Sequence, residues 1–275
     1  MRENKNTELP FYLIKKGKSL RLVKVILIVI AFLVVLFPED SSAQSRKVEN
    51  MPSYDYSKYH FGFILAINQM YFTIKPIENL HLTMFDSIAA KEINADSAMI
   101  YSILGAPTTG FTVGIVSNLR LGDFFDLRFI PSLSFGERYI DYRFLKWRDG
   151  EPTIVDQRKN IPSTFIELPL QIKYKSKRLN NFRAYLLGGV NTRIDLASQA
   201  KKKKDAGVVQ VKLNKADVYG EIGVGFDFYF EWFKFGTEIK MSYGLSDILK
   251  HEDNIYTDGI EKMSSKIFQL TFTFE

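Results

Sequence analysis

The sequence predicts an all-β protein, a transmembrane antiparallel up-and-down β-barrel of about eight strands with both termini in the periplasm. Two observations support this prediction. Aromatic-rich stretches alternate apolar and polar residues, and the links between these stretches run long, short, long, short. In the outer membrane, the apolar face of each strand meets lipid, the polar face lines the lumen, and long outer loops alternate with tight periplasmic turns.

The stretch 220–230 shows the alternation most clearly. Val224, Phe226 and Phe228 share one face, whereas Glu221 and Asp227 share the other face with two glycines. Successive side chains of a strand point to opposite sides, so this stretch is a strand with one apolar side. Glycines beside carboxylates on the opposite side are typical of the lining of a narrow barrel.

The other strands follow in chain order with the same period. The eight predicted strands lie near residues 59–72, 109–121, 124–136, 164–175, 181–196, 220–230, 233–245 and 266–274. In the fifth strand the outward set is either Ala184 with Leu186 or Tyr185 with Leu187. Pro131 falls within the third strand, where the missing N–H predicts a bulge or a local defect in the ladder; Pro169 gives the same prediction for the fourth strand.

The links between the strands set the orientation. Short turns are predicted at 122–123, 176–180 and 231–232, and long links at 73–108, 137–163, 197–216 and 246–265. Within the first long link, residues 79–98 carry apolar residues at helical spacing and predict a short helix that caps the barrel mouth. Aromatic residues flank the first and third turns, as expected for an interfacial belt: Phe124, Phe125, Tyr229, Trp232 and Phe233.

The N-terminus predicts export. Lys and Arg residues precede the apolar run 25–37, and Ser41 and Ala43 are small residues suited to a signal-peptidase site between Ala43 and Gln44. The run is shorter than the about 20 apolar residues that a membrane-spanning helix needs. We therefore expect a signal peptide over 1–43, a periplasmic lead-in over 44–58 and the barrel over 59–275.

Composition limits the classes of function. The 275 residues include no cysteine, which excludes disulfides, thiolate zinc sites and lipid attachment at an N-terminal cysteine. About half of the formal charge of +6 lies in the predicted signal peptide, and the remaining Lys and Arg are scattered, which argues against nucleic-acid binding. The histidines lack metal-ligand spacing, and phosphate-loop and nucleophile-elbow motifs are missing. We predict no catalytic, cofactor-binding or metal-binding residue, no enzyme activity and no small-molecule substrate.

The predicted lumen carries charges of both signs. Its members are Arg128, Glu167, Lys173, Glu221, Asp227, Lys234, Glu238 and Lys240. A barrel of about eight strands is filled by its own side chains, so these charges are expected to pair with one another. The alternative is that they form a polar path or a gate.

Several strings resemble the PorT family of Bacteroidetes outer-membrane barrels. They lie at 59–63, 68–70, 128–138, 167–178, 180–185 and 272–275, and the string from Leu168-Pro169-Leu170 to Arg178 is the most specific. The resemblance extends over roughly residues 48–275. It implies an outer-membrane location and an accessory or assembly role in the type IX secretion system, which exports proteins with C-terminal signals and supports gliding motility. It also implies contacts with outer-membrane lipid and with other type IX components, and it includes Pro131 and Pro169 as family features.

Two other functions remain open from the residues. A structural or adhesive barrel would bind surface ligands through its long outer loops. A lipid-modifying barrel enzyme would use His60 or His251 beside a serine near the rim.

Overall fold

The computed structural model describes residues 48–197, 211–252 and 254–275. These residues belong to one compact unit, Val48–Glu275. The predicted signal peptide and its cleavage site between Ala43 and Gln44 lie outside the described residues. No helix within the described ranges is long and apolar enough to span a membrane.

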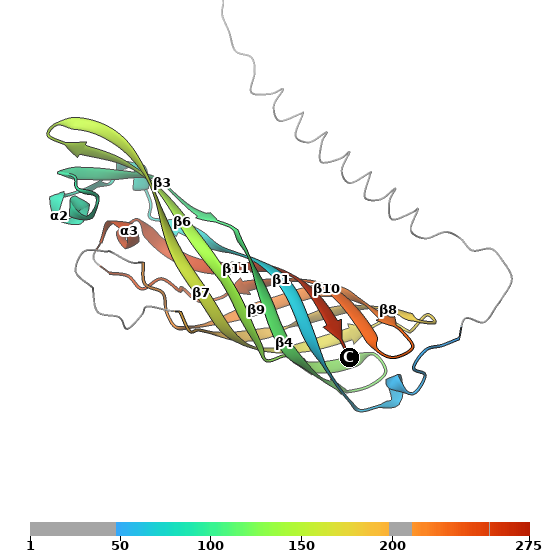
Figure 1. Cartoon of the computed structure of the whole chain (residues 1–275). Helices are drawn as coiled ribbons and strands as arrows, with labels where there is room; N and C mark the ends of the chain where they lie inside the picture. Colours follow the sequence, from blue (N-terminus) through green and yellow to red (C-terminus); the bar gives the residue numbers. More distant parts are fainter. Residues whose placement is uncertain (1–47, 198–210, 253) are drawn as a thin grey trace, which may run out of the picture. The chain divides into compact units, whose positions relative to one another are not determined.

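The described residues form one antiparallel sheet of eleven strands (Figure 1). The strands are β1 (Tyr59–Pro76), β2 (Met84–Phe85), β3 (Ser97–Ala106), β4 (Thr108–Arg120), β5 (Phe125–Phe129), β6 (Ser132–Arg148), β7 (Glu151–Lys175), β8 (Phe182–Asp195), β9 (Ala216–Tyr229), β10 (Lys234–Gly244) and β11 (Ile260–Phe274). β1 pairs with both β11 and β4, so the sheet returns to itself as a barrel.

β5 and β6 act as one strand of the barrel wall. Both pair with β4 and with β7, and Ile130 and Pro131 separate them. The break lies opposite Pro169 of β7, whose carbonyl accepts a bond from the Ile130 N–H at 3.3 Å. Counted this way, the barrel has eight strands in chain order, which confirms the predicted fold class.

The two prolines differ in their effect. Pro131 interrupts the ladder as predicted, whereas β7 runs through Pro169 without a register shift and pairs it with Asn191. The predicted local defect in the ladder is nevertheless present at Pro169 on the side of β5 and β6, because Leu168 and Pro169 have no Cα partner in either strand. The missing N–H of Pro169 points toward the break, where a ladder bond is already absent.

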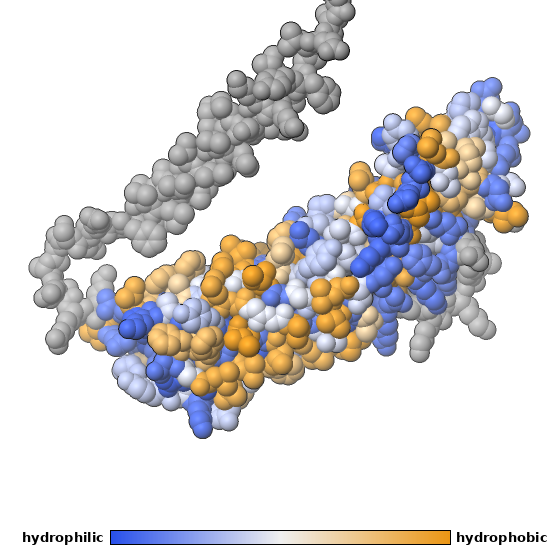
Figure 2. Space-filling view, turned by 180° about the vertical axis from the view of Figure 1, so that it is seen from behind, coloured by the Kyte–Doolittle hydropathy of each residue, from blue (hydrophilic) through white to orange (hydrophobic). Residues whose placement is uncertain are grey.

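The alternation places apolar side chains outside and polar side chains inside. Val224 and Phe226 are 47% and 44% exposed, whereas Asp227 is 2% exposed. In β8, Leu186 is exposed while Tyr185 and Leu187 are buried, so Ala184 with Leu186 is the outward set. Figure 2 shows hydrophobic residues gathered over the barrel wall.

The first two long links are largely ordered as strands. The link 137–163 is a hairpin of β6 and β7 that turns at Asp149 and Gly150, both with positive φ. β3 pairs with the other edge of β6, and β2 pairs with β3. We call the part of β6 and β7 beyond the barrel, together with β2 and β3, the projecting sheet. The predicted long link is here a pair of strands, because residues such as Ile140, Tyr142 and Phe144 continue the period of two.

A hydrophobic cap covers the end of the barrel that carries the long links, the loop end. The predicted helix over 79–98 is instead divided into η2 (Leu80–Leu82), β2, α2 (Ser87–Ala90) and η3 (Lys91–Ile93) before β3 begins. Asn79 and Asn94, with positive φ, interrupt a continuous helix. These pieces pack with α3 (Ile255–Asp258) around a buried cluster that includes Phe144 and Tyr256. The cap itself agrees with the prediction.

Candidate functional site

All eight charged side chains predicted for the lumen are at most 6% exposed. Three ion pairs join members of this set: Arg128 with Glu238 at 2.9 Å, Lys173 with Asp227 at 2.7 Å, and Lys240 with Glu221 at 3.3 Å. The other two members pair with residues outside the set. Glu167 contacts Arg193 at 3.3 Å, and Lys234 contacts Glu275 at 2.6 Å.

Glu221 is the centre of the middle cluster. One of its carboxylate oxygens accepts from Ser242 at 2.8 Å and Asn191 at 2.9 Å, and the other accepts from Gln171 at 2.7 Å. Arg193 lies 3.4 Å away and also contacts Glu167. Two carboxylates, Arg193 and Lys240 thus balance their charges inside the barrel.

A second cluster lies between this centre and the end of the barrel that carries the short turns, the turn end. The Tyr185 hydroxyl donates to Glu238 at 3.2 Å, and the Lys173 ammonium lies 3.6 Å from the centroid of the Tyr185 ring. Gly225 makes room for this tyrosine, because a Cβ at that position would lie 2.4 Å from Tyr185 Cζ. The glycines beside carboxylates in β9 therefore accommodate large neighbours.

Arg138 joins the polar interior to the cap. Its guanidinium donates to Ser163 at 2.8 Å and Ser265 at 3.2 Å, and it pairs with Asp195 at 3.4 Å. The same group lies over the Phe72 ring, 4.4 Å from the centroid. A buried arginine with this set of partners closes the interior from the loop side.

The lead-in covers the turn end. The Tyr54 hydroxyl of η1 (Tyr54–Tyr56) donates to Glu275 at 2.6 Å, and Arg183 donates to both oxygens of Asp55 at 2.8 and 2.9 Å. Burial raises the pKa of Asp55, but the bond and charge of Arg183 and the charge of Arg178 outweigh it and hold the pKa below its ordinary value. The Tyr54 ring stacks on His60 at 3.9 Å.

Tyr229 also belongs to the turn end and corrects one part of the predicted aromatic belt. Its side chain is 2% exposed and lies inside, with the Arg178 guanidinium 3.7 Å from its ring centroid. Phe124, Phe125, Trp232 and Phe233 are exposed around the turns, as predicted for an interface.

Sequence reasoning missed several residues that complete the interior, among them Arg138, Asp195, Arg193, Glu275, Tyr54 and Asp55. Arg193 lies on the same face of β8 as Tyr185, so the correct choice of the inward face of that strand would have predicted it. Glu275 lies one residue beyond β11 and continues the inward-facing set of Thr271 and Thr273. Tyr54 and Asp55 carried no local signal, because their partners are more than 120 residues away in sequence.

The interior is therefore filled. A water-filled lumen would expose its lining, yet Gln171, Asn191 and Ser242 are fully buried in the middle of the barrel. Unpaired charges in such an environment would cost several kcal/mol each. The ion pairs satisfy the eight predicted charges, the cap covers one end and the lead-in covers the other.

The outer face of the projecting sheet carries two ion pairs. Arg143 binds Asp156 through two bonds of 2.7 and 3.0 Å, and Arg158 binds Asp141 through two bonds of 2.6 and 2.8 Å. The hydrogen bond from Arg158 lowers the pKa of Asp141, and that from Arg143 lowers the pKa of Asp156. The face is polar but balanced in charge.

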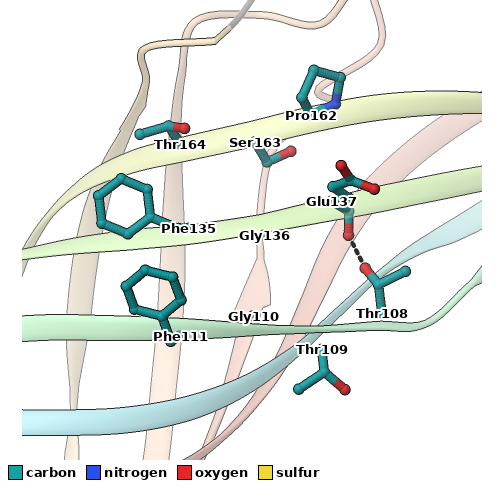
Figure 3. A pocket seen from close by; sticks show the side chains of 10 residues that line it. All are labelled: Thr108, Thr109, Gly110, Phe111, Phe135, Gly136, Glu137, Pro162, Ser163 and Thr164. Atoms are coloured by element: carbon teal, nitrogen blue, oxygen red, sulfur yellow. Dashed lines mark hydrogen bonds between the residues drawn. The ribbon is translucent and has the colours of Figure 1, made fainter.

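A hollow of about 540 Å³ marks the junction between the barrel wall and the projecting sheet. Figure 3 shows its lining from β4, β6 and β7, with the Thr108 hydroxyl directed at the Glu137 carbonyl. The Phe111 and Phe135 rings stack at 4.9 Å on one side. Glu137 is the one charged residue of the lining, so the hollow does not gather groups for acid–base chemistry.

Within the described residues, no cluster of three or more His, Cys, Asp or Glu could hold a metal ion. His60 Nε2 is 2.8 Å from the Tyr54 carbonyl oxygen at the turn end, and His251 lies 3.4 Å from Asp247. In the part of the chain that the structure describes, neither histidine is hydrogen-bonded to a serine.

Comparison with known proteins gives a family and distant structural likenesses. Residues 42–250 match the family model described as "Outer membrane protein beta-barrel domain". No curated protein sequence matches the chain. Among solved structures, neisserial surface protein A is 10% identical over 79% of this chain and 98% of its own (TM-score 0.36). OprG from Pseudomonas aeruginosa is 11% identical over 78% and 94% (TM-score 0.36), and the outer-membrane protease OmpT from Escherichia coli is 12% identical over 84% and 99% (TM-score 0.36).

Proposed function

The chain belongs to the outer-membrane β-barrel domain family and is a protein of the outer membrane, and from this premise we propose that it is an accessory or assembly component of type IX protein secretion. In this role it supports the export of proteins with C-terminal signals, and gliding motility, as a member of the PorT family. The membrane lipid and other type IX components are its partners.

The filled interior is the observation that supports an accessory role. The buried ion pairs of Arg128, Lys173 and Glu221 occupy the space through which a passenger would have to pass. An eight-stranded barrel holds little more than its own side chains. A separate protein therefore supplies the conduit, and this chain acts through contacts at its turn end or its projecting sheet.

The string that most resembles the PorT family also contributes to this interior. It places Pro169 opposite the break between β5 and β6, and it supplies three charged residues that form ion pairs: Lys173, Lys175 and Arg178. The resemblance thus lies in residues with a structural task, which supports common ancestry of the fold with that family.

A gene deletion tests the proposal. We expect the deletion strain to retain type IX cargo inside the outer membrane, and the complemented strain to secrete it again. The barrel in the complemented strain should show heat-modifiable gel mobility. Secretion at the normal level in the deletion strain would contradict the proposal.

The ordered projecting sheet favours a second candidate, an adhesive barrel that binds surface ligands. Deleting residues 141–158, which form most of the projecting hairpin, separates the two. The secretion role predicts that deletion of the gene stops cargo export, whereas the adhesive role predicts that removal of residues 141–158 abolishes surface binding and that deletion of the gene leaves export intact. An enzyme role would change the mass of lipid A on gene deletion, and we expect no change.

We also propose that the mature chain begins at Gln44 and that residues 44–58 are a periplasmic lead-in to the barrel at 59–275. Residues 48–58 of this lead-in contact the turn end through Asp55 and Asn50. Mass spectrometry of the protein purified from the outer membrane gives its first residue. Retention of residues 1–43 would contradict cleavage.

A further inference from the structure

β7 has a free edge in the projecting sheet. It pairs with β6 from Glu151 to Glu167, but with β8 only from Phe165 onward. Among the described residues, no strand pairs with the other edge of β7 over residues 152–163. A strand edge of this kind offers a row of unpaired N–H and C=O groups to another strand.

The residues that face this edge are known from the register. The Leu196 N–H donates to the Thr164 carbonyl at 2.7 Å, so Thr164 points toward the β8 side. The ladder with β6 has no register shift, and the alternation therefore continues to the hairpin turn. Ile154, Asp156, Arg158 and Asn160 present both N–H and C=O to the free edge, and Pro152 and Pro162 lie on the same side without an N–H.

This edge is symmetric about Gln157. Pro152 and Pro162 stand at equal distances on either side of it, and so do Asp156 and Arg158. We propose that two copies of this chain pair through this edge, antiparallel about Gln157, to form one continuous sheet. In that register Asp156 lies opposite Arg158 of the second copy, and the ladder ends at both sides where proline lacks an N–H.

Charge selects this register over its neighbours. Each copy already pairs Arg158 with Asp141 and Asp156 with Arg143 across β6 and β7. Pairing about Gln157 extends these pairs into rows of alternating sign across four strands. Pairing about Asp156 or about Arg158 would place like charges directly opposite, which destabilises a sheet.

The proposed pairing also determines the orientation of the two barrels relative to each other. The twofold axis of this pair is perpendicular to the sheet, because the strands are antiparallel. β6 and β7 run from the barrel wall into the projecting sheet as continuous strands (Figure 1). The two barrels therefore point toward each other and lie in facing membranes. This contact is independent of the secretion role.

Cysteine crosslinking tests the register, since the chain has no cysteine of its own. Residues 157 of the two copies form a non-hydrogen-bonded pair, with Cβ atoms about 4.5–5.5 Å apart. Gln157→Cys should give a disulfide-linked dimer under mild oxidation in detergent. Val155→Cys is the matched control, because its two copies would be about 13 Å apart along the strands. Equal crosslinking of both variants, or none of Gln157→Cys, would overturn the proposal.

A proline substitution tests the edge without a new cysteine. Asn160→Pro removes an edge N–H but leaves the bonds to β6, whereas Asn160→Ala keeps that N–H. We expect light scattering with size exclusion to show dimers for the wild type and Asn160→Ala, and at least a tenfold weaker dimer for Asn160→Pro. Heat-modifiable mobility of all variants controls for folding. Equal dimerisation of the two Asn160 variants would overturn the edge contact.

Vesicles test the facing arrangement. Gln157→Cys chains with two different tags are reconstituted in separate populations of phosphatidylcholine vesicles, which are then mixed and oxidised. The proposal predicts a disulfide dimer that carries both tags, together with clustering of the vesicles. Crosslinks only between chains that share a vesicle would overturn the facing arrangement.

Discussion

Replacing Glu221 by glutamine tests whether the interior charges hold the barrel together. The change keeps the volume of the side chain and removes its charge. In the wild type, Glu221 accepts hydrogen bonds from Gln171, Asn191 and Ser242 and pairs with Lys240 at 3.3 Å. Among the described residues, Lys240 has no other carboxylate within ion-pair distance, so the substitution leaves a buried ammonium without its counter-charge.

The magnitude follows from this loss. Removing one partner of a buried ion pair costs about 3–5 kcal/mol, because the other charge stays buried and uncompensated. Arg193 retains Glu167, so its contribution to the cost is smaller. We expect Glu221→Gln to lower the free energy of unfolding by about 3–5 kcal/mol. The double variant Glu221→Gln with Lys240→Met removes both charges and should recover much of that loss.

Denaturant unfolding in detergent micelles, followed by tryptophan fluorescence, measures the difference. Glu261→Gln is the matched control, because Glu261 pairs with Lys75 at 2.5 Å on the surface, where the two side chains are 46% and 67% exposed. Exposed pairs contribute about 0–1 kcal/mol. Equal effects of the two Glu→Gln variants would refute the reasoning that the interior pairs are buried and mutually dependent.

Two further predictions concern the fit of β9 and the anchoring of the lead-in. Gly225→Ala places a Cβ 2.4 Å from Tyr185 Cζ and 2.7 Å from the Thr237 carbonyl oxygen, whereas a Cβ at Gly220 meets nothing within 4 Å. The same unfolding assay should show a loss of about 1–3 kcal/mol for Gly225→Ala, and equal stability of the Gly225 and Gly220 variants would contradict the packing. The depressed pKa of Asp55 means that its contacts stabilise the lead-in above the unfolded pKa of about 4, and that this contribution is lost as the pH falls through the folded pKa. The protection of the amides of residues 48–58, measured as their exchange rate relative to an unstructured chain at the same pH, should fall on acidification in the wild type and be low already at neutral pH in Asp55→Asn; wild-type protection in Asp55→Asn at neutral pH would contradict the anchoring role.

Local periodicity explains why so much of the barrel could be predicted. Side chains of a strand alternate between lipid and lumen, so Glu221 and Asp227 could be assigned to the interior from their own stretch of sequence. The hairpin of β6 and β7 could also have been predicted from the sequence. Its turn, Asp149-Gly150, is a strong hairpin signal, and Ile140 and Tyr142 alternate with charged residues before it.

The remaining features depend on contacts between distant segments. The pairing of β3 with β6 joins two links that local patterns treat separately. Asp55 meets Arg183 across the turn end, and Tyr229 turns inward because Arg178 covers its ring. No period within one segment specifies such partners, so they follow only from the closed sheet.

Conductance across a planar lipid bilayer tests the central claim most directly, that the lumen is filled by its own ion pairs and that the protein acts through contacts. After insertion of the purified, heat-modifiable barrel, we predict no steady single-channel current at neutral pH. Glu221→Gln, if it inserts, should give transient openings because its interior is less firmly paired. A stable current through the wild-type barrel would contradict the account.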